Sequence, residues 1–133
     1  MALNKFIVRN TLTTSAVKVS GNSGKSTITL TGDLLGDGFE VQGTPTASIK
    51  SITWTGDTNG VITIKRNNEV IFTLQANAAG MLDFSGDFQF PDNTFAEHDI
   101  EVSVNNIQCE LWLRLNKSGY SFVQQNAPKQ KWN

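Results

Sequence analysis

A chain of 133 residues is long enough for one domain, because two domains of half this size would each bury too little apolar surface to be stable without disulfides or metal ions. The apolar fraction of 38% and the formal net charge of −1 are typical of a globular protein and exclude a disordered one. The Lys and Arg residues are scattered and form no basic stripe, so we expect no nucleic acid among the partners.

Short runs with period-two alternation, rich in β-branched and aromatic residues, follow one another along the chain. Besides the two pairs described next, they predict strands at residues 6–8, 16–19, 27–31, 49–54, 81–84 and 120–123. No window has the apolar spacing of an amphipathic helix, and residues 74–82 are expected to form a loop. About eight to ten short strands at this spacing predict a sandwich or a barrel.

Two hairpins are predicted from alternating runs that flank Asn pairs. In the first, residues 61–65 and 70–74 flank Asn67-Asn68, and Asn tolerates the positive φ of a two-residue primed turn. In the second, residues 99–104 pair with residues 109–115 across Asn105-Asn106. The strands of the second hairpin place apolar residues on one face and charged residues on the other, so we expect each to bury one side.

Together these elements predict an all-β fold. We expect one antiparallel β domain, a sandwich or a barrel, that occupies residues 1–133, with extended terminal arms at residues 1–10 and 124–133. Residues 6–9 could pair with a strand of a neighbouring sheet. The polar C-terminal tail is equally compatible with disorder and with docking on a neighbouring chain through Trp132.

The N-terminal sequence and the single cysteine indicate where such a chain is made. The first six residues lack the apolar segment of a signal peptide, and no stretch is long enough to span a bilayer, so we expect no membrane partner. Cys109 excludes an internal disulfide and lies in an alternating run, which predicts a buried strand position. The chain is therefore compatible with a reducing cytoplasm.

Several motifs resemble sites of chemistry but lack part of what that chemistry requires. Residues 21–27 resemble the end of a phosphate-binding loop, yet the first glycine of that motif would fall at Val19, and a strand-like run follows where a helix is needed. The triplet at residues 97–99 contains the single His, but adjacent strand residues point to opposite faces. Asp83 and Asp87 could mimic a glycosidase dyad, with nothing to place them in a cleft. We therefore expect no enzyme and no cofactor.

We expect no metal site. The acidic, Gly-rich loop from Asp33 to Glu40 does not have the spacing of the calcium loop of a helical hand, although its oxygen ligands leave calcium binding open.

Two tryptophans differ in their phase. Trp54 is in phase with Ile52 and is expected in the core, whereas Trp112 is out of phase with Leu111 and Leu113. An outward Trp112 could stack on a sugar or lie under a partner protein.

Four stretches resemble small β domains of tailed bacteriophages, of the kind found among capsid decoration (cement) proteins. They are SITWTG at 51–56, ITIKRNNEV at 62–70, LDFSG at 82–86 and LRLNKSGY at 113–120. The resemblance covers roughly the C-terminal two-thirds of the chain. It implies a jelly-roll-like sandwich on the outside of an icosahedral head, where it bridges neighbouring major capsid proteins and stiffens the shell.

With this resemblance, we expect a capsid decoration protein that is made in the host cytoplasm and ends on the outer surface of the virion. Its partners would be the major capsid protein and other copies of the chain, with a trimer favoured over a dimer. The expected partner-binding residues are Phe6, Ile7, Arg9, Trp112 and Trp132. The alternative is a carbohydrate-binding or tail-fibre domain that recognises a glycan on the host surface.

Overall fold

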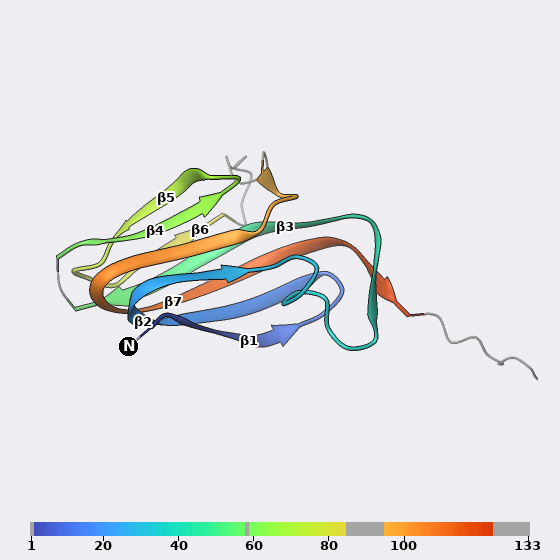
Figure 1. The fold of residues 1–133 in the computed structure, drawn as a ribbon, viewed down its shortest axis with the longest axis horizontal. Helices are drawn as coiled ribbons and strands as arrows, with labels where there is room; N and C mark the ends of the chain where they lie inside the picture. Colours follow the sequence, from blue (N-terminus) through green and yellow to red (C-terminus); the bar gives the residue numbers. More distant parts are fainter. Residues whose placement is uncertain (1, 58, 85–94, 124–133) are drawn as a thin grey trace, which may run out of the picture.

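The computed structural model describes residues 2–57, 59–84 and 95–123, which form seven strands with antiparallel pairing (Figure 1). The strands are β1 (Asn4–Asn10), β2 (Thr14–Ile28), β3 (Phe39–Gly56), β4 (Val61–Arg66), β5 (Glu69–Gln75), β6 (Gly80–Asp83) and β7 (Ile100–Phe122). The order is β1-β2-β7-β3-β6, and β4 pairs with both β5 and β7. The predicted all-β, jelly-roll-like sandwich is confirmed, with strands that are longer than the alternating runs indicated.

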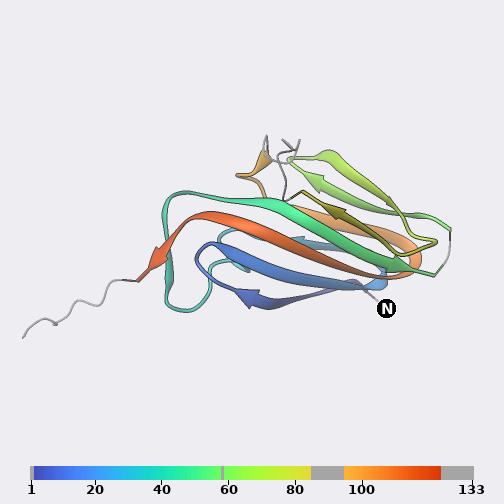
Figure 2. The same ribbon diagram turned by 180° about the vertical axis from the view of Figure 1, so that it is seen from behind.

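Two long strands, β2 and β7, run through both layers of the sandwich. Residues 14–21 of β2 pair with residues 109–116 of β7, and residues 23–28 pair with residues 100–105. The first pair joins β1, β3 and β6 in what we call the large sheet, and the second pair joins β4 and β5 in the small sheet. Figure 2 shows the large sheet in front of the small one.

The predicted hairpin between residues 99–104 and 109–115 is wrong. Apart from Asp99, both segments lie in β7, and each pairs with β2 instead of with the other. Between them β7 passes from the small sheet to the large one, at a corner where Asn106 has a φ of 57° and the register with β2 shifts. Corners and turns both favour residues that tolerate positive φ, so the Asn pair did not distinguish them.

The other predicted hairpin is confirmed. Strands β4 and β5 pair from Val61 to Arg66 across Asn67 and Asn68. The φ angles of these two Asn residues are 54° and 61°, the positive values that a type I′ turn requires.

The apolar core lies between the two sheets and takes alternate residues from both. The largest fully buried apolar side chains are Ile28, Leu34, Ile52, Ile62, Ile64, Ile100, Leu111, Leu113, Leu115, Val17 and Val19. Burying each such side chain contributes about 1.5–3 kcal/mol relative to leaving it exposed. The alternation that predicted the strands therefore also supplies the main stabilising term.

The N-terminal residues, expected to form an arm, complete the large sheet instead. Strand β1 pairs with β2 from Asn4 to Asn10 and is the outermost strand on that side. Leu3 is buried and Ile7 packs against the core, so pairing within the chain removes apolar surface from water that a free arm would expose. The C-terminal arm, residues 124–133, lies outside the described residues.

A buried arginine holds the segment that leads into β7. Arg66 follows Ile62 and Ile64 in the inward phase of β4 and is 1% exposed. Its guanidinium donates from Nη1 to the carbonyl of Ala47 at 2.6 Å, and from Nε to the carbonyl of His98 at 3.0 Å. These bonds satisfy backbone acceptors that the interior would otherwise leave without donors.

A buried lysine in β7, Lys117, also donates to backbone carbonyls in the interior, at the far end of the large sheet. The Nζ atom of Lys117 donates to the carbonyls of Leu34 and Thr11 at 2.7 and 2.8 Å, and it lies 4.3 Å from the centroid of the Tyr120 ring. Burial lowers the pKa of Lys117 to about 8. Burial of the Tyr120 hydroxyl, together with the charge of Asp99, raises the pKa of Tyr120 to about 12.

Among the described residues there is no helix with the length and hydropathy needed to cross a membrane.

Candidate functional site

The outer face of the large sheet brings together exposed aromatic and basic side chains from separate parts of the sequence. One cross-strand row runs from Phe6 on β1 through Lys18, Trp112 and Thr53 to Met81 on β6. We call this the aromatic row. Its two ends are open to solvent, since Phe6 is 52% exposed and Met81 is 59% exposed. Exposed apolar side chains that share one sheet face with basic and polar ones can contribute to an interaction surface.

The centre of the aromatic row is held by a charged network. The ammonium of Lys18 lies 6.0 Å from the centroid of the Phe6 ring and 5.8 Å from that of Trp112. Glu110 accepts a 2.8 Å hydrogen bond from the Trp112 indole N–H and lies 3.7 Å from the Lys18 ammonium. The network limits the rotamers of both aromatic rings before any partner arrives, and this lowers the entropy cost of binding.

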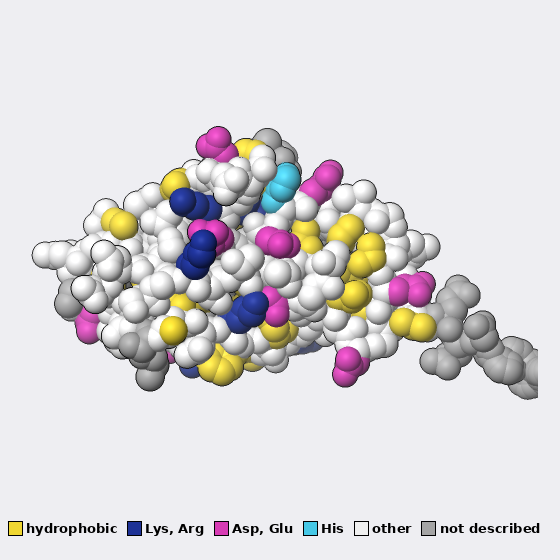
Figure 3. Space-filling view, in the orientation of Figure 1, with side chains coloured by type: hydrophobic (Ala, Val, Ile, Leu, Met, Phe, Trp, Pro, Cys, Tyr) yellow, Lys and Arg dark blue, Asp and Glu magenta, His cyan; other side chains and the backbone are white. Residues whose placement is uncertain are grey.

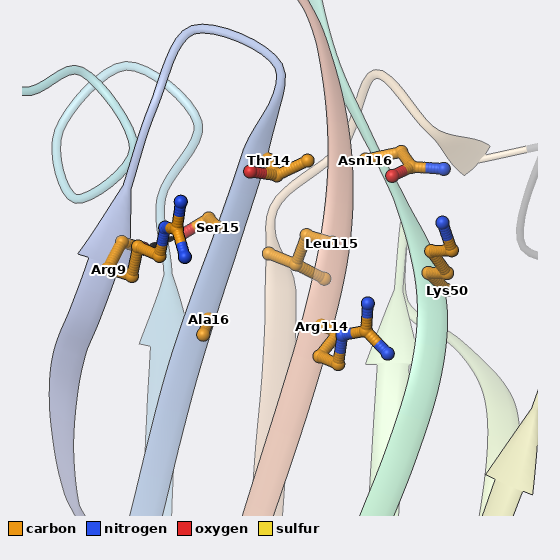
Figure 4. Close-up of a pocket in the computed structure, with 8 residues that line it drawn as sticks. All are labelled: Arg9, Thr14, Ser15, Ala16, Lys50, Arg114, Leu115 and Asn116. Carbon is orange, nitrogen blue, oxygen red and sulfur yellow. Dashed lines mark hydrogen bonds between the residues drawn. The ribbon is translucent and has the colours of Figure 1, made fainter.

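A hollow of about 220 Å³ lies beside the aromatic row and is lined by three cations. We call it the basic hollow. Its lining residues, on β1, β2, β7 and β3 (Figure 4), are Arg9, Thr14, Ser15, Ala16, Lys50, Arg114, Leu115 and Asn116. Ala16 on β2 is the register partner of both Arg9 on β1 and Arg114 on β7. Because its side chain is small, the space between the two arginines stays open.

Two β-bulges aim basic residues at this hollow. In β1 the register shifts between Ile7 and Arg9, which places Arg9 opposite Ala16 on the outer face. Without that shift Arg9 would lie opposite Ser15, which is buried. In β3 a second shift makes Lys50 the extra residue beside Arg114. Bulges often re-aim side chains next to functional sites, and here two separate strands do so at one place.

The three cations of the basic hollow form no ion pair with an acid in residues 2–57, 59–84 and 95–123. The ion pairs in the described part of the chain are Lys5 with Asp33 and Lys18 with Glu110. Neither involves Arg9, Lys50 or Arg114. Three like charges on one exposed patch repel each other and favour a ligand with negative charge.

The opposite face of the sandwich differs in character. Figure 3 shows Lys, Arg, Asp and Glu side chains of both signs interspersed over the small sheet. Hydrophobic side chains gather on that face toward the end of the molecule where β7 ends. In this region the rings of Phe39 and Phe122 meet edge to face, with centroids 5.7 Å apart.

Three of the predicted partner-binding residues lie together on the outer face of the large sheet. Phe6 and Trp112 belong to the aromatic row, and Arg9 lines the basic hollow. Ile7 packs against the core, so it is not part of this surface. Trp132 lies outside the described residues. The prediction that Trp54 faces the core and Trp112 faces outward agrees with their register.

Other residues of this surface were not identified from the sequence. Lys18, Lys50 and Arg114 are distant in sequence, and only strand pairing makes them neighbours of Phe6 and Arg9. Arg114 is two residues from Trp112 in the same strand, so the alternation of side chains places both on the outer face and could have identified Arg114 from the sequence. The position of Lys50 depends on a bulge, for which the sequence contains no signal.

Three of the motifs that resembled chemical sites have structural roles, and Asp87 of the fourth lies outside the described residues. Residues 21–27 lie within β2 and open no helix. The main-chain N–H of Leu30 donates to the Asp99 carboxylate at 2.9 Å. Asp33 is partly buried, which raises its pKa, but hydrogen bonds from Lys5 and Thr29 hold the pKa below its usual value. No group of three His, Cys, Asp or Glu residues suited to a metal ion occurs in residues 2–57, 59–84 and 95–123.

Cys109 is buried, as its strand phase predicted, and carries no disulfide. Burial and the nearby charge of Asp57 raise the pKa of its thiol. A raised pKa keeps the thiol protonated and therefore a weak nucleophile.

Comparison with known proteins gives likeness of fold only. Neither a family model nor a curated protein matches the sequence. The chain is similar to KdgF from Halomonas sp., with a TM-score of 0.37 and 10% identity over 86% of this chain and 79% of that one. A protein with a double-stranded β-helix domain from Klebsiella pneumoniae has a TM-score of 0.38 and 12% identity, over 92% of this chain and 85% of that one.

A cupin domain from Bordetella pertussis likewise has a TM-score of 0.38, with 5% identity over 87% of this chain and 93% of that one. At these scores and identities the likeness carries no argument about activity, ligand or partner.

Proposed function

We propose that this chain is a binding protein that docks the outer face of its large sheet on another protein. Following the sequence resemblance, we propose that the partner is the major capsid protein of a tailed bacteriophage and that the chain decorates the outside of the virion as a homo-oligomer. The observation that carries the docking role is the exposed aromatic row from Phe6 to Met81, ordered by Lys18 and Glu110.

A sheet face that presents side chains from several strands suits a protein partner better than it suits a small molecule. The aromatic row and the basic hollow lie side by side, so a partner can bury apolar surface at one and form ion pairs at the other. Buried aromatic residues and Arg are the usual anchors of protein interfaces, surrounded by polar contacts. Phe6 and Arg9 on β1, with Trp112 and Arg114 on β7, have this composition.

The aromatic row is less suited to a glycan. A sugar would stack on the face of Trp112, where the Lys18 ammonium lies 5.8 Å from the ring centroid. The indole N–H is already bonded to Glu110. A sugar would have to displace this network, whereas a docking protein can bury the network intact.

The proposal is tested by co-sedimentation of the purified chain with expanded phage capsids, using Phe6→Ser and a matched control, Val70→Ser. Val70 is 53% exposed on β5 of the small sheet, close to the 52% of Phe6. Burying about 100 Å² of the Phe6 ring would contribute about 2.5 kcal/mol, so we expect Phe6→Ser to weaken binding at least about tenfold. Val70→Ser should bind like the wild type.

Equal binding by the two variants would contradict docking through the large sheet. Failure of the wild type to bind capsids, together with a monomer mass in light scattering, would contradict the capsid role. A saturable change of tryptophan fluorescence with one member of a glycan panel, absent from the capsid titration, would favour the glycan-binding alternative.

A further inference from the structure

We propose that the basic hollow binds paired carboxylates, presented by Asp or Glu side chains on the surface of a docked protein. This inference rests on the proposed docking function and names the chemistry that the large sheet recognises. It assigns the ligand-binding role to Arg9, Lys50 and Arg114.

The spacing of the two arginines favours two anionic groups over one. Arg9 on β1 and Arg114 on β7 are separated by β2 alone, with Ala16 between them. Neighbouring strands lie about 4.8 Å apart, so the two Cα atoms are about 10 Å apart. Each guanidinium can form a two-bond contact with its own carboxylate, and such pairs add geometric specificity to the charge attraction.

Lys50 and Asn116 complete the side of the hollow opposite β1. Figure 4 shows Lys50 on β3 beside Arg114 and Asn116 of β7. Lysine acts as a point charge without the directional fork of arginine, so it can satisfy an oxygen left over from either carboxylate. Asn116 is exposed at the rim of the hollow, where its amide N–H groups can donate to a bound carboxylate.

A free phosphate fits this hollow less well than carboxylates do. Phosphate sites usually surround the anion with backbone N–H groups of a loop or a helix N-terminus. The floor here is a sheet in which the backbone groups of Ala16 and Arg114 belong to strand ladders. Recognition must therefore come from side chains spread over several strands, an arrangement that suits acidic residues spread over a protein surface.

The experiment uses the full chain with ¹³C-labelled alanine and follows the Ala16 methyl signal by NMR. The two ligands are a hexaglutamate peptide and inorganic phosphate, each titrated at constant ionic strength. We expect the peptide to cause a saturable shift of the Ala16 methyl signal, and to bind at least about tenfold more tightly than phosphate. We expect Arg114→Gln to weaken peptide binding by about tenfold or more.

The matched control is Lys25→Gln, which removes one exposed positive charge from the small sheet. It should bind the peptide like the wild type because Lys25 does not line the hollow, and it changes the net charge by the same amount as Arg114→Gln. Equal weakening by the two variants would show nonspecific attraction and overturn the site. A saturable response to phosphate without one to the peptide would overturn its assignment to protein carboxylates.

Docking on capsids, measured separately by co-sedimentation, distinguishes failure of the site from failure of the proposed function. If the peptide shifts the Ala16 signal but the chain does not dock on capsids, the hollow binds acidic protein surfaces and the capsid is not its partner. Capsid docking that is unchanged in Arg114→Gln, with no peptide response at Ala16, would retain docking and overturn the site.

Discussion

Replacing Lys117 with Met should change how the free energy of unfolding depends on pH. Lys117 is 6% exposed, and its pKa falls from 10.5 to about 8 in the folded chain. Between these two values the unfolded chain holds a proton on this amine that the folded chain has lost. Raising the pH therefore favours the folded state in this window.

The size of the effect follows from the two pKa values. With 10.5 for the unfolded chain and about 8 for the folded one, the contribution of Lys117 increases by about 2 kcal/mol between pH 7.5 and pH 9.5. Cys109 and Tyr120 oppose this trend, since raised pKa values in the folded chain reduce stability as the pH rises past their unfolded values. Both groups remain in the Lys117→Met variant, so they cancel when the two proteins are compared.

The assay is urea unfolding of the wild type and Lys117→Met at pH 7.5, 8.5 and 9.5. The difference in unfolding free energy, wild type minus variant, should rise by about 2 kcal/mol in favour of the wild type over this range. A constant difference would mean that the oxygen acceptors at Asn10, Thr11 and Leu34 hold the ammonium well enough to offset its burial. The reasoning from desolvation would then be refuted.

Three further predictions concern the stability of the sandwich. Arg66→Met leaves buried carbonyls without donors and should lower the unfolding free energy by about 3–5 kcal/mol in urea titrations; a loss below 1 kcal/mol, about the size of a surface substitution, would contradict this role. Gly21→Ala makes a Cβ clash with the Ala2 carbonyl oxygen and should cost about 2 kcal/mol or more, whereas Gly24→Ala, also at positive φ but with open space around it, should cost less. Cys109 should react with a thiol reagent at a rate that follows unfolding in urea, and rapid reaction in native buffer would contradict its burial.

Local patterns in the sequence predicted those parts of the fold that depend on neighbouring residues. The β4–β5 hairpin follows from two alternating runs around an Asn pair, and the depth of Cys109 and Trp54 follows from strand phase. These features need one strand and its turn, so a short window contains all the information.

The parts that failed depend on which strand pairs with which. The segment around Asn105-Asn106 has the composition of a turn, but β2 runs alongside through the same corner and keeps both halves of β7 paired. The large sheet also takes up residues 4–10, because a free N-terminal arm would leave Leu3 and Ile7 exposed to water. Both outcomes are decided by long-range pairing, which composition does not specify.

The candidate site was predicted in part. Phe6, Arg9 and Trp112 were selected separately, and the sheet places them on one face. The scatter of Lys and Arg along the sequence predicts no basic stripe for nucleic acid, but it did not reveal that strand pairing gathers Lys50 and Arg114 with Arg9. Spacing along a chain is a poor measure of spacing across a sheet, where each strand crossing adds about 4.8 Å.

The most direct test of docking through the large sheet is lysine acetylation of the chain, free and bound to expanded capsids, read by mass spectrometry. Lys18 and Lys50 belong to the aromatic row and the basic hollow, whereas Lys25 and Lys65 lie on strands of the small sheet. Docking as proposed predicts that capsids protect Lys18 and Lys50 and leave Lys25 and Lys65 reactive. Protection of Lys25 and Lys65 instead, or of none of the four, would contradict it.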